Sequence, residues 1–204
     1  MDGITMKIKL AALCLLASSS VFAQENKVIA GVNYATSLSA EATATFENID
    51  DEITEDIDIS DLGFYLGYVS NRNNRFLVSY SSASVDFDKS DGEEDITGFD
   101  FDWQFVYGKE QVQPYLGLGL GLHTIDEALI LNGTDKEGES LSGVSVQLMA
   151  GIKLAVNEQI ELDVSVKRKA YAWQSVQISA GFFSDTLDTS YVTNSLSFGA
   201  GFKF

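Results

Sequence analysis

The sequence has little cysteine, proline, histidine or positive charge. Its 204 residues include one cysteine, one proline and one histidine, and 13 lysines and arginines stand against 30 aspartates and glutamates. The formal charge of −17 argues against nucleic acid as a partner, because phosphate binding depends on clustered Lys and Arg. With Cys14 as the only cysteine, no disulfide can form within the chain.

Long apolar runs are also missing. Apolar residues make up 45% of the chain, yet no run approaches the roughly 18 residues that a membrane-spanning helix needs. If the chain crosses a membrane it must therefore do so as a closed β-barrel, because only helices and closed barrels satisfy their backbone in lipid. The length suits a single domain.

The N-terminus is typical of a secretory signal peptide. Lys7 and Lys9 precede the short apolar stretch 10–17, and small residues end at Ala23 before Gln24. We expect residues 1–23 to be cleaved and residues 24–204 to form the mature domain, since an N-terminal anchor helix would need a longer apolar core. Cleavage would remove two lysines and Asp2, so 13 basic and 30 acidic residues become 11 and 29, a charge of −18.

The last stretch of the chain alternates with a period of two. Its apolar positions share one parity, and they are Val192, Leu196, Phe198, Ala200, Phe202 and Phe204. Such alternation predicts a strand with one apolar face. An exposed edge strand that ends on an aromatic residue favours aggregation, and a barrel that pairs its last strand with its first has no such edge.

The same alternation recurs along the chain. It predicts strands over residues 27–38, 58–70, 96–107, 112–124, 142–156, 160–171 and 191–204, and a further strand that begins at residues 76–80 and fades over 81–88. The acidic stretches 39–58 and 86–95, together with 126–140 and 174–190, are expected to be long loops, and short turns alternate with them. The pattern predicts an all-β fold, an eight-stranded antiparallel up-and-down transmembrane β-barrel.

Residues 96–107 show the clearest alternation. Phe99, Phe101, Trp103, Phe105 and Tyr107 share one face, opposite Asp100 and Asp102. Five aromatic side chains on one face fit lipid outside and a polar lumen inside. An aromatic girdle is expected near the short turns, from Tyr68, Phe76, Phe105, Tyr107, Phe202 and Phe204.

Two stretches resemble a known family. Residues 114–121, PYLGLGLG, and the aromatic C-terminal strand are similar to those of the small outer-membrane β-barrel domain family that includes OmpA/OmpX-type barrels. The resemblance implies the outer membrane of a Gram-negative cell, with outer-membrane lipids and lipopolysaccharide as partners of a monomer. It also implies that Phe198, Phe202 and Phe204 are read by the barrel assembly machinery.

Charged residues on the opposite parity are expected inside the barrel. They are Asp100, Asp102, Lys153, Glu161, Asp163, Lys167, Lys169 and Lys203. They could form an ion or proton path, but eight strands leave an interior that side chains fill, so we favour a paired polar core. Tyr171 and Trp173 also fall on the inward parity, which either a β-bulge or a strand extension beyond the membrane would explain.

Candidate sites for chemistry are few. His123 is expected at the outer rim near Asp126, where it could act as a base in lipid modification, but a His-x-Ser pattern is absent. Residues 86–92 resemble a calcium loop with the glycine one place late, and the acidic stretches could instead hold divalent ions or be solvated. We expect no catalytic residue, metal or cofactor.

Three roles fit these features. We favour a non-enzymatic surface-interaction or membrane-integrity role through acidic outer loops; the alternatives are a narrow porin-like channel and an outer-leaflet lipid A-modifying enzyme. Two soluble folds are less consistent with the sequence. A lipocalin would begin with Gly-x-Trp and end with a helix, and a two-sheet sandwich would leave Phe204 exposed.

Overall fold

The computed structural model describes residues 27–47, 51–88, 92–108, 110–180 and 183–204. Its strands are β1 (Lys27–Phe46), β2 (Asp51–Val69), β3 (Arg75–Phe87), β4 (Glu93–Val106), β5 (Val112–Asp126), β6 (Leu141–Ala155), β7 (Ile160–Trp173), β8 (Val176–Ala180) and β9 (Phe183–Lys203), with a short 3-10 helix, η2 (Leu129–Leu131). The predicted signal peptide lies outside the described residues. No helix in the described part of the chain is long and apolar enough to cross a membrane.

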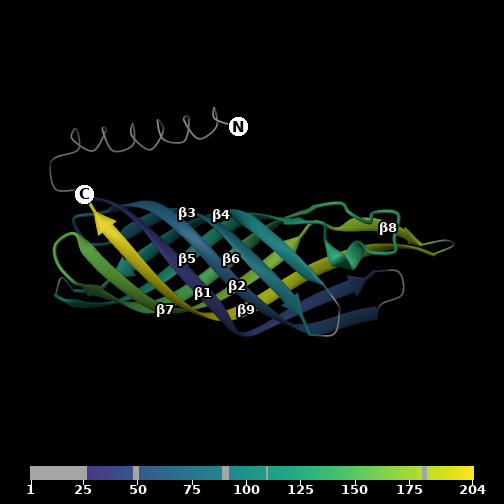
Figure 1. Cartoon of the computed structure of the whole chain (residues 1–204), viewed down its shortest axis with the longest axis horizontal. Coiled ribbons are helices and arrows are strands. Elements are labelled where there is room, and N and C mark those ends of the chain that lie inside the picture. Colours follow the sequence, from purple (N-terminus) through teal and green to yellow (C-terminus); the bar gives the residue numbers. More distant parts are fainter. Residues whose placement is uncertain (1–26, 48–50, 89–91, 109, 181–182) are drawn as a thin grey trace, which may run out of the picture.

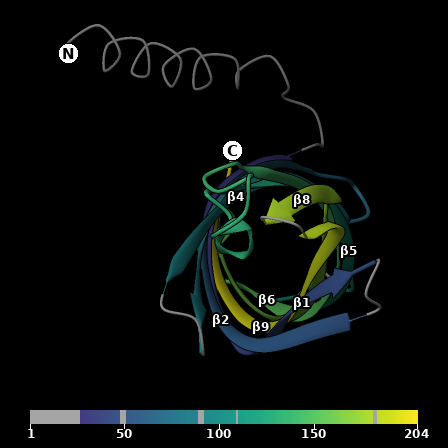
Figure 2. The ribbon, with the colours of Figure 1, turned by 90° about the vertical axis from the view of Figure 1, so that its right-hand side faces the viewer.

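The strands form a closed antiparallel barrel. Each long strand pairs with the next, and β1 pairs with β9 to close the ring, while the short β8 pairs only with β9. The barrel is elongated, with the C-terminus and the short turns at one end (Figure 1). Viewed from the opposite end, the strands surround a central axis, and β8 and the β5–β6 connection lie over the opening (Figure 2). The predicted eight-stranded up-and-down barrel is confirmed. The short strand β8 is an addition that pairs only with β9 and does not take part in the closed ring.

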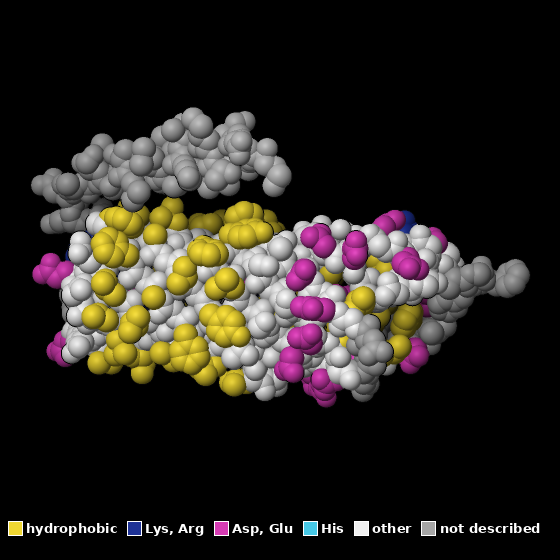
Figure 3. Space-filling model, viewed as in Figure 1, with side chains coloured by type: hydrophobic (Ala, Val, Ile, Leu, Met, Phe, Trp, Pro, Cys, Tyr) yellow, Lys and Arg dark blue, Asp and Glu magenta, His cyan; other side chains and the backbone are white. Residues whose placement is uncertain are grey.

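The half of the barrel near the short turns has an apolar exterior. Along β5, Leu116, Leu118, Leu120 and Leu122 are 44–60% exposed, and Phe99 and Phe101 of β4 are each 51% exposed. On the face shown in Figure 3, apolar side chains gather over this half of the molecule, and we call this apolar exterior the apolar belt. Near the turns Phe76 stacks on Trp103 with ring centroids 5.3 Å apart. Exposed apolar surface of this extent marks an interaction surface, and on the outside of an outer-membrane β-barrel it is the lipid-facing band.

The other half of the barrel corrects the sequence prediction. Residues 39–46 and 51–58 were expected to be loop but belong to β1 and β2, and β9 begins at Phe183, within the stretch expected to be a loop. Only the connection over residues 127–140 is long and largely irregular among the described residues. In these extensions the polarity is reversed: along β2, Asp56 and Asp58 point outward while Ile57 and Ile59 are buried inside.

A β-bulge explains why the sequence pattern predicted β1 only as far as residue 38. The register of β1 with β9 shifts between Ser37 and Ser39. Before the shift Ala35 faces inward, and after it Ala40 and Ala42 do so while Glu41 faces outward. A single extra residue exchanges the two faces of a strand, so a search for one continuous parity ends at the bulge.

Candidate functional site

The barrel lumen contains the predicted polar residues. β7 contributes Glu161, Asp163, Lys167 and Lys169; β4 contributes Asp100 and Asp102; β6 and β9 contribute Lys153 and Lys203. All eight lie on the inward parity of their strands. They fall into two clusters. The inner cluster lies near the short turns, and the outer cluster lies nearer the opposite end of the barrel, toward the strand extensions.

The inner cluster is centred on Glu161 and Arg75. The Arg75 guanidinium donates to the Glu161 carboxylate, and both side chains are at most 2% exposed. Lys203 Nζ lies 2.7 Å from Glu161 Oε2, and Lys153 Nζ lies 2.8 Å from Asp163 Oδ2. Arg75 was not among the residues predicted to line the lumen, although it shares the inward parity of β3. The cluster closes the lumen with paired charges.

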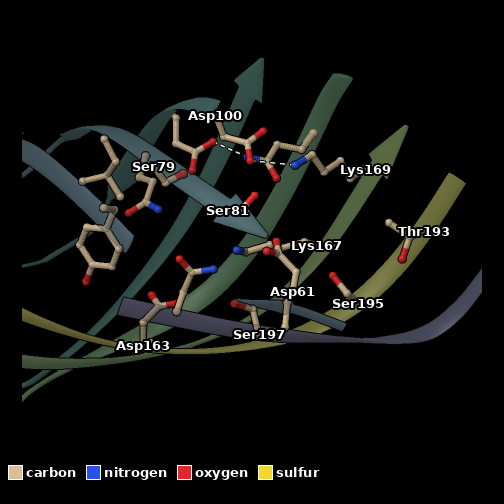
Figure 4. A pocket seen from close by; sticks show the side chains of 18 of the residues that line it. Asp61, Ser79, Ser81, Asp100, Asp163, Lys167, Lys169, Thr193, Ser195 and Ser197 are labelled. Atoms are coloured by element: carbon tan, nitrogen blue, oxygen red, sulfur yellow. Dashed lines mark hydrogen bonds and ion pairs between the residues drawn. The ribbon is translucent and has the colours of Figure 1, made fainter. Parts of the chain in front are cut away.

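A small polar cavity lies between the two clusters. It has a volume of about 60 Å³, and its lining includes Asp61, Lys167, Thr193 and Ser197 (Figure 4). The hydroxyls of Thr193 and Ser197 and one carboxylate oxygen of Asp61 have no hydrogen-bond partner within the described protein. A polar cavity of this size exceeds the ~10–15 Å³ that a water molecule needs, so water can satisfy these groups.

The outer cluster includes the histidine. Lys169 Nζ donates to Asp100 Oδ2 at 2.8 Å, and His123 Nε2 lies 3.3 Å from Asp100 Oδ1 and 3.0 Å from Ser145 Oγ. The prediction of a rim histidine was wrong: His123 is 4% exposed inside the lumen. Its position follows from β5, where the inward parity of Gly119 and Gly121 continues to His123.

This cluster does not have the geometry of a Ser-His-Asp triad. In a Ser-His-Asp triad the carboxylate binds one imidazole nitrogen and the serine binds the other. Here Nε2 contacts both Asp100 and Ser145, and Nδ1 has no hydrogen-bond partner among the described residues. The group also faces the lumen instead of the lipid. Among described residues no group of three or more His, Cys, Asp or Glu could hold a metal.

An apolar cap fills the lumen above the outer cluster. It comprises Ala40, Ala42, Ala44, Ile57, Ile59, Ala83, Val85, Ile96, Ile125, Ala128, Leu131, Leu141, Tyr171, Trp173, Ile178, Leu187 and Tyr191. The cap explains the inward parity of Tyr171 and Trp173. The pairs that β7 makes with β6 and β9 contain no register shift, so strand extension, and not a bulge in β7, places these rings inside.

The β5–β6 connection closes the cap from outside. Ala128 and Leu131 are both 0% exposed, and the backbone N–H of Leu129 donates to Glu94 Oε1 at 2.7 Å. Asp135 fixes the connection to β8, because its N–H donates to the carbonyl of Ser179 and its carboxylate accepts from the N–H of Ser179. The lumen is thus closed at its outer end by packed apolar side chains.

The outer face of the strand extensions is acidic. Four pairs of carboxylates lie directly opposite each other on neighbouring strands: Glu41 and Asp56, Asp58 and Asp86, Asp86 and Glu93, and Asp95 and Asp126. The acidic side chains follow directly on the apolar belt (Figure 3). Like charges in such positions repel, so this face is not optimised for stability.

Comparison with known proteins agrees with this architecture. A family model described as the outer membrane protein beta-barrel domain matches residues 10–204. No curated protein is significantly similar in sequence.

Several solved structures share the fold. Neisserial surface protein A (NspA) matches with a TM-score of 0.50 and 16% identity, over 89% of this chain and 98% of that one. OprG from Pseudomonas aeruginosa gives 0.53 and 15%, over 88% and 96%. AlkL, solved in lipid bilayers, gives 0.54 and 17%, over 89% and 91%. At these sequence identities the similarity shows a shared fold.

Proposed function

Because the chain belongs to the outer membrane protein beta-barrel domain family, we propose that it is a non-conducting, non-enzymatic barrel of the cell outer membrane. Its role is a surface-interaction or membrane-integrity function carried by the acidic strand extensions. The observation that carries this proposal is the closure of the lumen at two levels.

The two closures differ in chemistry. At the inner level Arg75 and Glu161 pair across the lumen and are almost fully buried. At the outer level Val85, Ile125 and Leu131 are 0% exposed. An ion on this path would have to break buried charge pairs and then cross an apolar layer, and desolvating an ion in an apolar medium costs many kcal/mol.

The outer surface supports a role outside the membrane. The extensions present a dense set of carboxylates to solvent, in positions where they repel each other and therefore lower stability. We propose lipopolysaccharide and outer-membrane lipids as partners of a monomeric protein, with divalent cations bridging these carboxylates to lipopolysaccharide phosphates, and the barrel assembly machinery as the reader of the C-terminal strand. A surface function accounts for charges that the fold does not need.

Conductance in a planar bilayer tests the closed lumen. The refolded mature protein is first shown to be folded by a shift in gel mobility on boiling. We expect no discrete current steps from the wild type, and steps from a variant that carries both Arg75→Ser and Leu131→Ser. Reproducible steps from the wild type would instead support a porin-like channel.

Complementation tests the surface role. Outer-membrane permeability to a dye is measured in cells that lack the protein and then carry either the wild type or a variant with Asp56, Asp58, Asp86 and Asp95 changed to Asn. We expect the variant to fold but not to restore the barrier. His123→Ala should restore it fully and leave lipid A unchanged; loss of a lipid A modification would support the enzyme alternative.

A further inference from the structure

Glu94 is a buried carboxylate without a cationic partner. It lies on the inward face of β4, is 1% exposed and accepts hydrogen bonds from Tyr191 Oη and from the backbone N–H of Leu129, both at 2.7 Å. No Lys, Arg or His in the described chain forms an ion pair with it. A buried charge is costly unless it is paired, so the ionised form of Glu94 places a negative charge without a cationic partner in the apolar cap.

Aromatic rings cluster around Tyr191, which donates a hydrogen bond to this carboxylate. Tyr191, which bonds it, has ring contacts with Phe87 at 6.4 Å and with Trp173 at 5.6 Å between centroids. Trp173 in turn stacks on Tyr171 at 5.6 Å. The faces of Trp and Tyr attract cations, most strongly where water is excluded. A carboxylate beside such rings is a suitable environment for an organic cation.

The space beside Glu94 is filled by one short segment of the β5–β6 connection. Residues 128–131 insert Ala128 and Leu131 into the cap and offer the Leu129 N–H to Glu94. The segment belongs to no strand of the ring, and the connection includes left-handed backbone at Glu127, Gly133 and Gly138. It can therefore leave without breaking the barrel ladder. A hydrogen-bond donor next to an apolar side chain is also the pattern of an alkylammonium ion.

We propose that the apolar cap is a binding site for a small organic monocation with an apolar body, an alkyl- or arylalkylammonium. The ligand displaces residues 128–131. Its ammonium group donates to Glu94 in place of Leu129, and its apolar body occupies the space of Leu131 within the apolar cap, which also contains Tyr171, Trp173 and Tyr191.

The exterior of the protein favours the same ligand class. The carboxylates around the extensions and the net charge of −17 create a negative potential, which raises the local concentration of cations and excludes anions. The site should therefore rank a cation above a neutral molecule of the same shape, and a neutral molecule above an anion.

Trp173 provides a specific reporter, because the chain has only two tryptophans and the other, Trp103, faces lipid. In a Trp103→Phe background in zwitterionic lipid nanodiscs, n-hexylammonium, n-hexanol and hexanoate are titrated at pH 8 while Trp173 fluorescence is recorded. We expect a saturable change with hexylammonium at a concentration at least tenfold lower than with hexanol, and no change with hexanoate.

Matched variants assign the selectivity. Glu94→Gln should abolish the tenfold preference, whereas Glu93→Gln, the same change on the neighbouring outward position, should retain it. Leu131→Ala, which weakens the competing segment, should bind hexylammonium more tightly. Each variant is first shown to be folded by its heat-modifiable gel mobility, and the Leu131 variant keeps the test decisive if Glu94→Gln does not fold.

Three outcomes would overturn the proposal. Equal binding of hexanol would show an apolar cap without cation selectivity. A fluorescence change that grows without saturation would show partitioning into lipid. An equal loss in the Glu93 and Glu94 variants would assign the preference to the surface potential alone.

Discussion

Arg75 and Glu161 join opposite walls of the barrel. β3 and β7 are separated by three strands on one side of the ring, yet the Arg75 guanidinium donates to the Glu161 carboxylate across the lumen. Lys203 and Lys153 approach the same carboxylate at 2.7 and 3.9 Å. This one acid therefore gathers three cations from three other strands.

The first prediction concerns this pair. Arg75→Met should lower the free energy of unfolding, but by less than the about 3–5 kcal/mol expected when a buried charge loses its only partner, because Lys203 and Lys153 remain beside Glu161. Urea unfolding of the refolded protein in lipid vesicles measures the change. Arg168→Met is the control, since Arg168 lies on the exposed outward parity of β7. Equal effects of the two changes would contradict a stabilising role for the lumen pair.

The second prediction concerns the acidic outer face. Asp86 lies opposite both Asp58 and Glu93, so Asp86→Asn should relieve two repulsions and raise stability by roughly 0.4–2 kcal/mol at low salt, at ~0.2–1 kcal/mol for each pair. The gain should shrink in 1 M salt, where charges are screened beyond about 3 Å. Glu52→Gln is the control, because Glu52 faces Thr45. A gain that does not depend on salt would point to a cause other than charge.

The third prediction concerns the inward glycines of β5. A Cβ on Gly121 would overlap His123, Asp100 and Ser145, whereas a Cβ on Gly199, also inward, would come no closer than 3.3 Å to a neighbour. Gly121→Ala should therefore destabilise the barrel by about 1–3 kcal/mol through overpacking, and Gly199→Ala by much less. Thermal unfolding followed by gel mobility compares them. If both tolerate alanine equally, the lumen around His123 is looser than its contacts indicate.

The sequence predicted the membrane half well and the outer half poorly. Lipid requires an unbroken alternation, so Leu116 to Leu122 and Phe99 to Trp103 show the strands directly. Above the lipid the two faces exchange their character: Ile57 and Ile59 face inward, and Asp56 and Asp58 face outward. A search for apolar residues on the outward face therefore interprets this stretch as a polar loop.

Long-range contacts account for the remaining differences. His123 was predicted at the outer rim because β5 was expected to end at residue 124. Its inward parity was already visible, but β5 continues to Asp126, and the barrel wall therefore extends beyond the histidine. The contact of Glu94 with Tyr191 joins positions 97 residues apart across the lumen, and no local pattern encodes it. The inward position of Arg75 could have been predicted by extending the inward parity of β3 back to its first residue.

The fourth prediction concerns the C-terminal aromatics. Phe204 is 47% exposed, and its N–H donates to the carbonyl of Val28. Because truncating the exposed ring leaves that backbone bond intact, Phe204→Ala should refold in vitro like the wild type but accumulate less in the outer membrane of cells. Tyr107→Ala, which removes an exposed aromatic ring near the same turns, is the control. Comparable membrane levels for both variants would remove the case for Phe204 as an assembly signal.

The last prediction follows from the environment of Glu94. Burial raises the pKa of its carboxyl above the usual value, and the hydrogen bonds from Tyr191 and Leu129 offset this only in part. The folded cap therefore holds the Glu94 proton more tightly than the unfolded chain does. Protonation stabilises the cap fully below the ordinary pKa of 4.5, and this contribution is lost as pH rises through the raised value.

Hydrogen exchange of residues 127–140, corrected for intrinsic rates, should show this dependence. Protection should fall as pH rises from 4.5 toward neutrality in the wild type. In Glu94→Gln it should stay high and constant, because the amide remains neutral and still accepts from Leu129. Glu93→Gln should behave like the wild type. Protection that rises with pH would mean that the ionised carboxylate is the form that holds the connection closed, and that its hydrogen bonds outweigh the cost of burying the charge.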